Sequence, residues 1–211
     1  MEDNSATFKL TLINTIIVAV NLIFFVAVII YNGNLFANYD ADIMLKMGAM
    51  SYNSFMSGRY YELITAMFLH FGVSHLANNM VLLTYAGCEL EKRVGRLAYI
   101  IIYFGSGIAG NVVSLWHYSN SNEDVVSAGA SGAIFGVIGA LIVYLIFNPS
   151  GEENLTPRRL IILAVMTIYY GYTTVGVNNA AHVGGLCFGI ISCFLLSKIL
   201  HYGKLEIARD L

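Results

Sequence analysis

The chain has 211 residues, of which 57% are hydrophobic and only 11% are charged. Soluble domains carry about a quarter charged residues, so this composition excludes an ordinary soluble protein and predicts a membrane protein. The formal net charge of −2 comes without any basic tract, so nucleic acid is not expected as a partner.

Six apolar runs follow one another along the chain. They cover residues 9–31, 74–90, 96–117, 128–147, 158–176 and 180–201. As helices, runs of this length can cross a hydrocarbon core of about 30 Å. The first run is too long for the apolar part of a signal peptide, so we expect it to remain as a span. The pattern predicts an all-α membrane protein, a bundle of six transmembrane helices.

No internal repeat or linker divides the chain, so residues 1–211 are expected to form a single six-helix membrane domain without a separate soluble domain. The connection 32–62 is the one long loop. Its Tyr52, Tyr60 and Tyr61 suit a boundary between membrane and water.

Basic residues predict the orientation. They follow the second run, separate the fourth from the fifth, and close the chain: Lys92, Arg93, Arg96, Arg158, Arg159, Lys198, Lys204 and Arg209. The turns 119–127 and 177–179 hold no Lys or Arg, whereas Lys46 and Arg59 in the first loop oppose the trend. By the positive-inside rule we expect cytoplasmic N- and C-termini, an external first loop, and a multi-pass protein of the cell membrane.

Four polar residues stand at the starts of even-numbered runs. His75 and Asn79 lie four residues apart near the start of the second run, Ser131 lies near the start of the fourth and His182 near the start of the sixth. With the N-terminus inside, even-numbered helices all begin on the outer side, so these four residues are expected in one leaflet. Unsatisfied polar groups inside a span are costly, so each needs a partner or a function.

Each residue alone has a structural explanation. Ser131 lies among small residues that let helices pack closely, and a lone His or Asn can serve an interhelical hydrogen bond. Together they suggest a catalytic site. Ser131 and His182 can act as nucleophile and general base, while His75 and Asn79 can donate hydrogen bonds to an oxyanion. No Asp or Glu lies within the core of a span, so a dyad is expected instead of a triad.

Small residues could bring the dyad together. Gly132 and Gly136 on the fourth run, with Gly185 and Gly189 on the sixth, would let the two backbones approach until Ser131 reaches His182. Phe135 follows Ser131 by one turn and could stack on the imidazole, although spacing alone equally allows it to face lipid or core.

Four motifs at these positions resemble the rhomboid family of intramembrane serine proteases. They are the segment from Phe68 to Asn79, which holds His-Phe and His-xxx-Asn, the Glu-x-Arg element within Glu89 to Gly95, Gly129-Ala130-Ser131-Gly132, and Ala181-His182-Val183-Gly184-Gly185. Their order and their positions on the runs match the family over nearly the whole chain.

The resemblance implies that Ser131 is the nucleophile and His182 the general base, with His75, Asn79 and the Ser131 N–H at the oxyanion. It implies supporting roles for Gly129, Gly132, Phe135 and Gly185, and for Glu91 and Arg93 as a pair that braces the cytoplasmic end. Transmembrane proteins in the lipid bilayer are the implied substrates. No cofactor or metal is expected.

Two positions depart from the family's pattern. Glu62 stands where the first loop often has an Arg after an aromatic residue, with Arg59 three residues earlier, and Asn178 stands where many relatives have Asp. The family's loop contacts are therefore not carried over.

Two alternative functions are a non-catalytic helix-binding protein and a small transporter. A non-catalytic rhomboid-like protein that binds transmembrane helices usually lacks Ser or His at the dyad, whereas this chain has both. A small transporter would continue its polar residues to the inner leaflet, but the fourth run is apolar after Ser131 and the sixth is apolar from His182 to Ser192.

Overall fold

The protein is seen in a computed structural model that describes residues 9–36, 38–119, 124–149, 155–174 and 176–207, with side chains up to residue 198. Within these residues the only β pairing is an isolated bridge between Met50 and Ser127. Residues 120–123 of the outer turn and Arg209, which entered the orientation argument, lie outside the described part, as does the side chain of Lys204.

The helices follow one another in the order α1 (Leu12–Asn32), α2 (Ala41–Met47), α3 (Tyr52–Met56), α4 (Glu62–Thr65), η1 (Ala66–Phe68), α5 (Val73–Leu82), η2 (Leu83–Gly87), α6 (Cys88–Val94), α7 (Arg96–Tyr118), α8 (Ser131–Phe147), α9 (Pro157–Thr173) and α10 (Asn179–Ile207). The element η1 is a 3-10 turn, whereas η2 is a π-helical turn between α5 and α6.

Each of the six predicted apolar runs coincides with helix. Among the described residues, α1, α7 and residues Asn179–Lys198 of α10 are long and apolar enough to cross a membrane. A fourth candidate is the pair Glu62–Phe68 and Val73–Val94, which bends by 93°, and α8 is a shorter apolar helix of 17 residues. The chain is thus an all-helical protein with three or four candidate spans, and the count of six and its orientation stay predictions.

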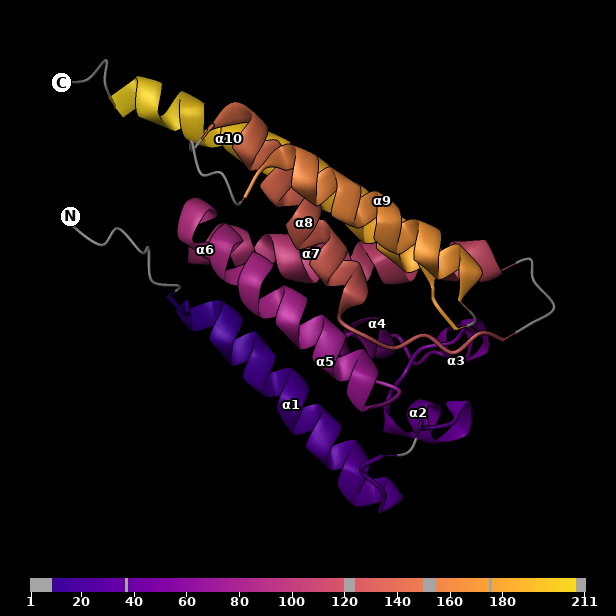
Figure 1. Cartoon of the computed structure of the whole chain (residues 1–211). Helices are drawn as coiled ribbons and strands as arrows, with labels where there is room; N and C mark the ends of the chain where they lie inside the picture. Colours follow the sequence, from indigo (N-terminus) through magenta and orange to yellow (C-terminus); the bar gives the residue numbers. More distant parts are fainter. Residues whose placement is uncertain (1–8, 37, 120–123, 150–154, 175, 208–211) are drawn as a thin grey trace.

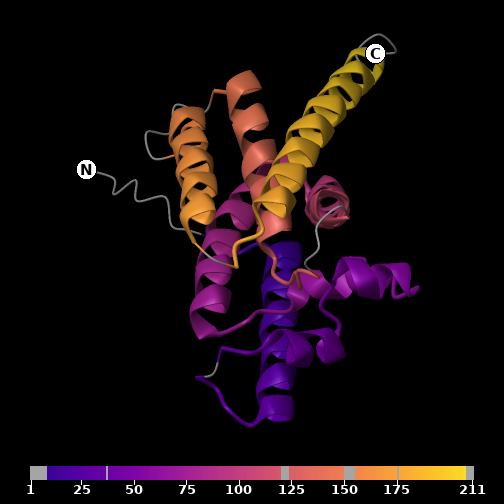
Figure 2. The ribbon, with the colours of Figure 1, turned by 90° about the vertical axis from the view of Figure 1, so that its right-hand side faces the viewer.

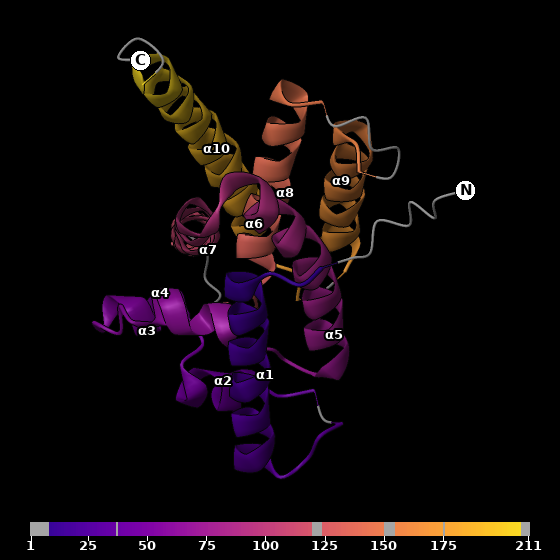
Figure 3. The ribbon, with the colours of Figure 1, turned by 90° about the vertical axis from the view of Figure 1, so that its left-hand side faces the viewer.

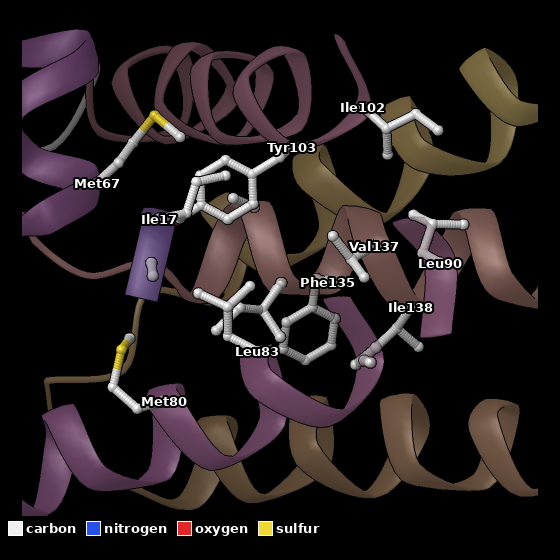
Figure 4. Packing of buried hydrophobic residues seen from close by; sticks show 14 of the residues in the cluster. Ile17, Met67, Met80, Leu83, Leu90, Ile102, Tyr103, Phe135, Val137 and Ile138 are labelled. Atoms are coloured by element: carbon white, nitrogen blue, oxygen red, sulfur yellow. The ribbon is translucent and has the colours of Figure 1, made fainter. Parts of the chain in front are cut away.

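Helix α8 lies inside the molecule. Figures 2 and 3 show it between α9 and α10, and its most extensive contact is with α10. Its residues from Gly132 to Val143 are all buried, which explains why the helix is apolar on every side. Figure 4 shows Phe135 in the surrounding cluster with Leu83 and Ile138.

The starts of α5, α8 and α10 lie on the same side of the molecule, at the right in Figure 1. The short helices α2, α3 and α4 of the first loop lie on that side too, while α1 begins and α10 ends at the left. The predicted site residues at the three helix starts are therefore carried to one end of the bundle.

The first loop is folded, which its sequence did not predict. Asp40 caps α2 and Ser51 caps α3 through a capping box with Ser54. The loop is tied to the segment before α8, because Met50 and Ser127 exchange two backbone hydrogen bonds of 3.0 and 2.7 Å. The side chain of Asp124 also accepts hydrogen bonds from Ser51 Oγ and the Asn53 N–H.

Glu91 and Arg93 have different partners. Glu91 is buried, and its carboxylate accepts from the backbone N–H groups of Ile13 and Asn14 at 3.1 and 2.8 Å. It thereby caps α1, whose own N-cap residue Thr11 makes no side-chain cap. Arg93 instead forms an ion pair with Glu89 on its own helix. The two residues of the Glu-x-Arg element thus serve separate contacts.

Candidate active site

A serine and a histidine meet at the starts of two packed helices. Ser131 is the first residue of α8 and His182 the fourth of α10, and 2.8 Å separates Ser131 Oγ from His182 Nε2. This is the normal distance of a hydrogen bond between these atoms. Ser131 is partly exposed to solvent, whereas only 6% of the surface of His182 is exposed.

Glycines allow the two helices to meet. A Cβ on Gly185 would lie 2.7 Å from the carbonyl carbon of Gly132, and a Cβ on Gly189 would overlap the Gly136 carbonyl oxygen. Gly132 follows Ser131 directly, and Gly185 follows His182 by three residues. Close backbone contact at these glycines therefore governs the distance between the serine and the histidine.

The imidazole of His182 stacks on Phe135. The ring centroids are 4.4 Å apart and the planes differ by only 12°. No described residue hydrogen bonds to the buried Nδ1 of His182, so no acidic group holds the ring from behind. The ring is instead positioned by Phe135 and by the start of α10. The face of Phe135 can also stabilise the imidazolium that forms when His182 takes a proton.

The N-terminus of α8 has free backbone donors. Its N-cap residue, Ala130, provides no side-chain cap, and the first intrahelical bond runs from Ile134 N to Ala130 O. The N–H groups of Ser131, Gly132 and Ala133 consequently lack an intrahelical partner. With the positive end of the helix dipole, they favour negative charge beside the serine.

His75 lies beside the loop that carries the serine. Its Nδ1 accepts a long hydrogen bond of 3.4 Å from the Phe71 N–H, which assigns the ring proton to Nε2. A Cβ on Gly129 would lie 2.9 Å from that Nε2 and 3.8 Å from Ser131 Oγ. Gly129 also has φ of +138°, so glycine is required here on two grounds.

Asn79 is buried one turn after His75 on α5. Its Nδ2 donates to the His75 carbonyl oxygen at 2.8 Å. An amide nitrogen carries two hydrogens, so a second donor remains. The structure thus brings Ser131, His182 and Phe135 into contact and sets His75 beside Gly129, whereas the recorded bond of Asn79 stays within its own helix.

Sequence reasoning missed a link between the two dyad segments. The Nδ2 of Asn178 donates to Ser127 Oγ at 3.0 Å and to Ser114 Oγ at 2.6 Å. The sequence held one sign of this link: a polar residue stands four positions before each dyad residue, Ser127 before Ser131 and Asn178 before His182. Within the described residues, no three His, Cys, Asp or Glu side chains gather as a metal site would require.

These features define a helical integral membrane protein with a partly buried hydroxyl–imidazole pair at one end of its bundle. Residues 57–199 match the family model of the rhomboid domain, which is well over half of the chain. The chain belongs to the rhomboid family.

Several relatives carry similar sequences. RHOMBOID-like protein 7 of Arabidopsis thaliana is 35% identical over 72% of this chain and 48% of its own length. Rhomboid protease GluP of Bacillus subtilis (strain 168) is 29% identical over 78% of this chain and 32% of its own length. Rhomboid protease AarA of Providencia stuartii is 30% identical over 79% of this chain and 66% of its own length. This chain therefore spans about half the length, or less, of the first two relatives.

Proposed function

We propose that this chain is an intramembrane serine endopeptidase that hydrolyses peptide bonds of membrane proteins through a Ser131–His182 dyad. The observation that carries the proposal is the 2.8 Å contact between Ser131 Oγ and His182 Nε2. A hydroxyl and an imidazole at this distance can transfer a proton directly. The relatives named as rhomboid proteases support the same reaction class.

The reaction follows from this geometry. Ser131 Oγ attacks the substrate carbonyl carbon while His182 Nε2 takes the hydroxyl proton. The tetrahedral intermediate then collapses, the C–N bond breaks, and His182 returns the proton to the leaving amine. Water repeats the same steps on the acyl-enzyme and releases Ser131. Phe135 stabilises the transient imidazolium by lying flat beneath it.

Negative charge develops on the carbonyl oxygen during attack. The free N–H groups at the start of α8, the Nε2–H of His75 and the second amide hydrogen of Asn79 are the donors we assign to it. Loss of one such donor typically costs about 3 to 4 kcal/mol in the transition state. Neither a cofactor nor a metal is needed for these steps.

The proposed substrates are transmembrane segments of other proteins, and the proposed location is the cell membrane. Backbone in a regular helix within lipid is internally hydrogen bonded, so its carbonyls are shielded from attack. The substrate helix must therefore unwind locally before Ser131 can reach a carbonyl. Residues 1–211 would act as a single six-helix unit in this role.

The test is labelling of the purified protein by a fluorophosphonate probe in detergent, together with cleavage of a model transmembrane substrate. We expect the wild type to be labelled and active, and Ser131→Ala to lose labelling and about 10⁴-fold or more of its activity. Ser192→Ala is the control, because that hydroxyl bonds only to the Gly189 carbonyl of its own helix among the contacts recorded. A folded wild type that is neither labelled nor active would refute the proposal, and a bound but uncut substrate would favour a helix-binding protein.

A further inference from the structure

Asn178 joins three separate parts of the molecule. It directly precedes α10, and its two amide hydrogens are both used, one by Ser127 Oγ and one by Ser114 Oγ. Ser114 lies on α7 and Ser127 on the segment that leads into α8, and both side chains are buried. Hydrogen bonds formed away from water are specific in geometry because an unmade bond would leave a costly unpaired group.

The other end of the same side chain caps α10. Asn178 Oδ1 accepts from the Ala181 N–H at 3.1 Å, and the Asn178 carbonyl accepts from the His182 N–H at 3.3 Å. These are the bonds that an N-cap residue supplies to the first turn of a helix. Asn178 therefore contacts the backbone of the histidine and that of the residue immediately before it.

Ser127 is a firm anchor for this contact. Its backbone is paired in both directions with Met50, and two residues later the Gly129 N–H donates to the Ala66 carbonyl at 2.8 Å. Ser131 follows at the start of α8. The segment that carries the serine is thus fixed to the first loop, and Asn178 fixes the helix that carries the histidine to that same segment.

No described side chain hydrogen bonds to Nδ1 of His182, so the position of the imidazole depends on the position of the helix start that carries it. We propose that Asn178 is a positioning residue, which holds the first turn of α10, and with it His182, in register with Ser131. This inference rests on the proposed dyad. In this proposal two kinds of contact hold α8 and α10 together. Hydrogen bonds of Asn178 act at the start of α10, and close packing of glycines acts further along both helices.

The chemistry of the side chain provides a selective test. Asn178→Ala removes the cap and both bonds to the serines. Asn178→Asp keeps an N-cap acceptor, and the hydroxyls of Ser127 and Ser114 can rotate to donate to the carboxylate. The same hydrogen bonds can then form with the two serine hydroxyls as donors and the carboxylate as acceptor. Ser127→Ala is a milder variant, which breaks the link between the two segments but leaves the α10 cap in place.

The experiment measures kcat and KM for a model transmembrane substrate, and the rate of fluorophosphonate labelling, below the unfolding temperature of every variant. We expect Asn178→Ala to lower kcat by roughly tenfold to a hundredfold with KM unchanged, as a misplacement of about 1 Å does. Asn178→Asp should recover most of this loss, and Ser127→Ala should show a smaller fall in kcat.

Asn111→Ala is the matched control. It also removes a buried asparagine bond, from Nδ2 to the Leu63 carbonyl at 2.9 Å, but one that does not join the dyad segments. We expect it to lower stability and keep kcat. A folded Asn178→Ala with wild-type kcat would overturn the inference, as would equal losses in Asn178→Ala and Asn178→Asp. If the wild type itself is neither labelled nor active, the proposed function fails instead.

Discussion

Replacement of Gly185 by alanine tests whether backbone contact between α8 and α10 sets the dyad distance. The new Cβ would overlap the carbonyl oxygen of Gly132 and lie 2.7 Å from its carbonyl carbon. Contacts between non-bonded carbons are normally about 3.5 to 4.0 Å, so the helices must separate by about 1 Å. Because Ser131 and His182 lie next to this contact, their 2.8 Å hydrogen bond would lengthen to about 3.8 Å and break.

The expected effect is on catalysis more than on folding. A misplacement of about 1 Å can lower the rate by about 10²-fold. Overpacking costs about 1 to 3 kcal/mol, and the better helix propensity of alanine returns about 1 kcal/mol of that. Gly185→Ala should therefore stay folded but react with a fluorophosphonate about a hundredfold more slowly than the wild type.

The assay compares labelling rates, with circular dichroism and thermal unfolding in the same detergent. Gly107→Ala is the matched control, since it adds the same methyl group at a buried helical glycine. Its nearest neighbour is the flexible end of the Met67 side chain, which can move aside, and α7 carries neither dyad residue. We expect this control to keep its rate within a few-fold. Wild-type labelling of a folded Gly185→Ala, or equal loss in both variants, would refute the reasoning.

Two further predictions concern residues beside the dyad and at the far end of the bundle. Phe135→Leu keeps an apolar side chain but removes the ring stacked on His182, so kcat should fall by roughly 2- to 13-fold, the equivalent of about 0.5 to 1.5 kcal/mol; an unchanged kcat would contradict this. Glu91→Gln weakens the cap on α1 and should lower the free energy of unfolding by about 1 to 3 kcal/mol while kcat below the transition stays unchanged. Unfolding in detergent checks the second change, and a stability equal to that of wild type would count against the cap.

The sequence was informative where the signal is local. Long apolar runs predict helices because every backbone group in lipid must be bonded within its own segment, and each of the six predicted runs is helical over most of its length. The rhomboid motifs could also be recognised in the sequence, since each is a short run of consecutive residues. The family match covers residues 57–199. The dyad roles themselves remain proposals for experiment.

Local signals were insufficient in the first loop and around the π-helical turn. The loop sequence of short polar and aromatic stretches did not predict α2, α3 and α4. Side-chain caps begin α2 and α3, and a backbone bridge joins Met50 of this loop to Ser127, 77 positions later in the chain. The turn η2 likewise has no periodic signature. A Cβ on its Gly87 would overlap Asn14 on α1, so this glycine serves a packing contact between helices.

By itself, the sequence determined that the chain is a helical membrane protein, which family it belongs to, and which residues carry reactive groups, because composition, periodicity and short motifs are written along the chain. The tertiary structure decided which of those groups meet. It paired Ser131 with His182, turned Glu91 toward α1 and linked Asn178 to Ser127 and Ser114. These contacts join residues 51 to 77 positions apart, and only the packing of helices through their glycines brings such distant groups within hydrogen-bond reach.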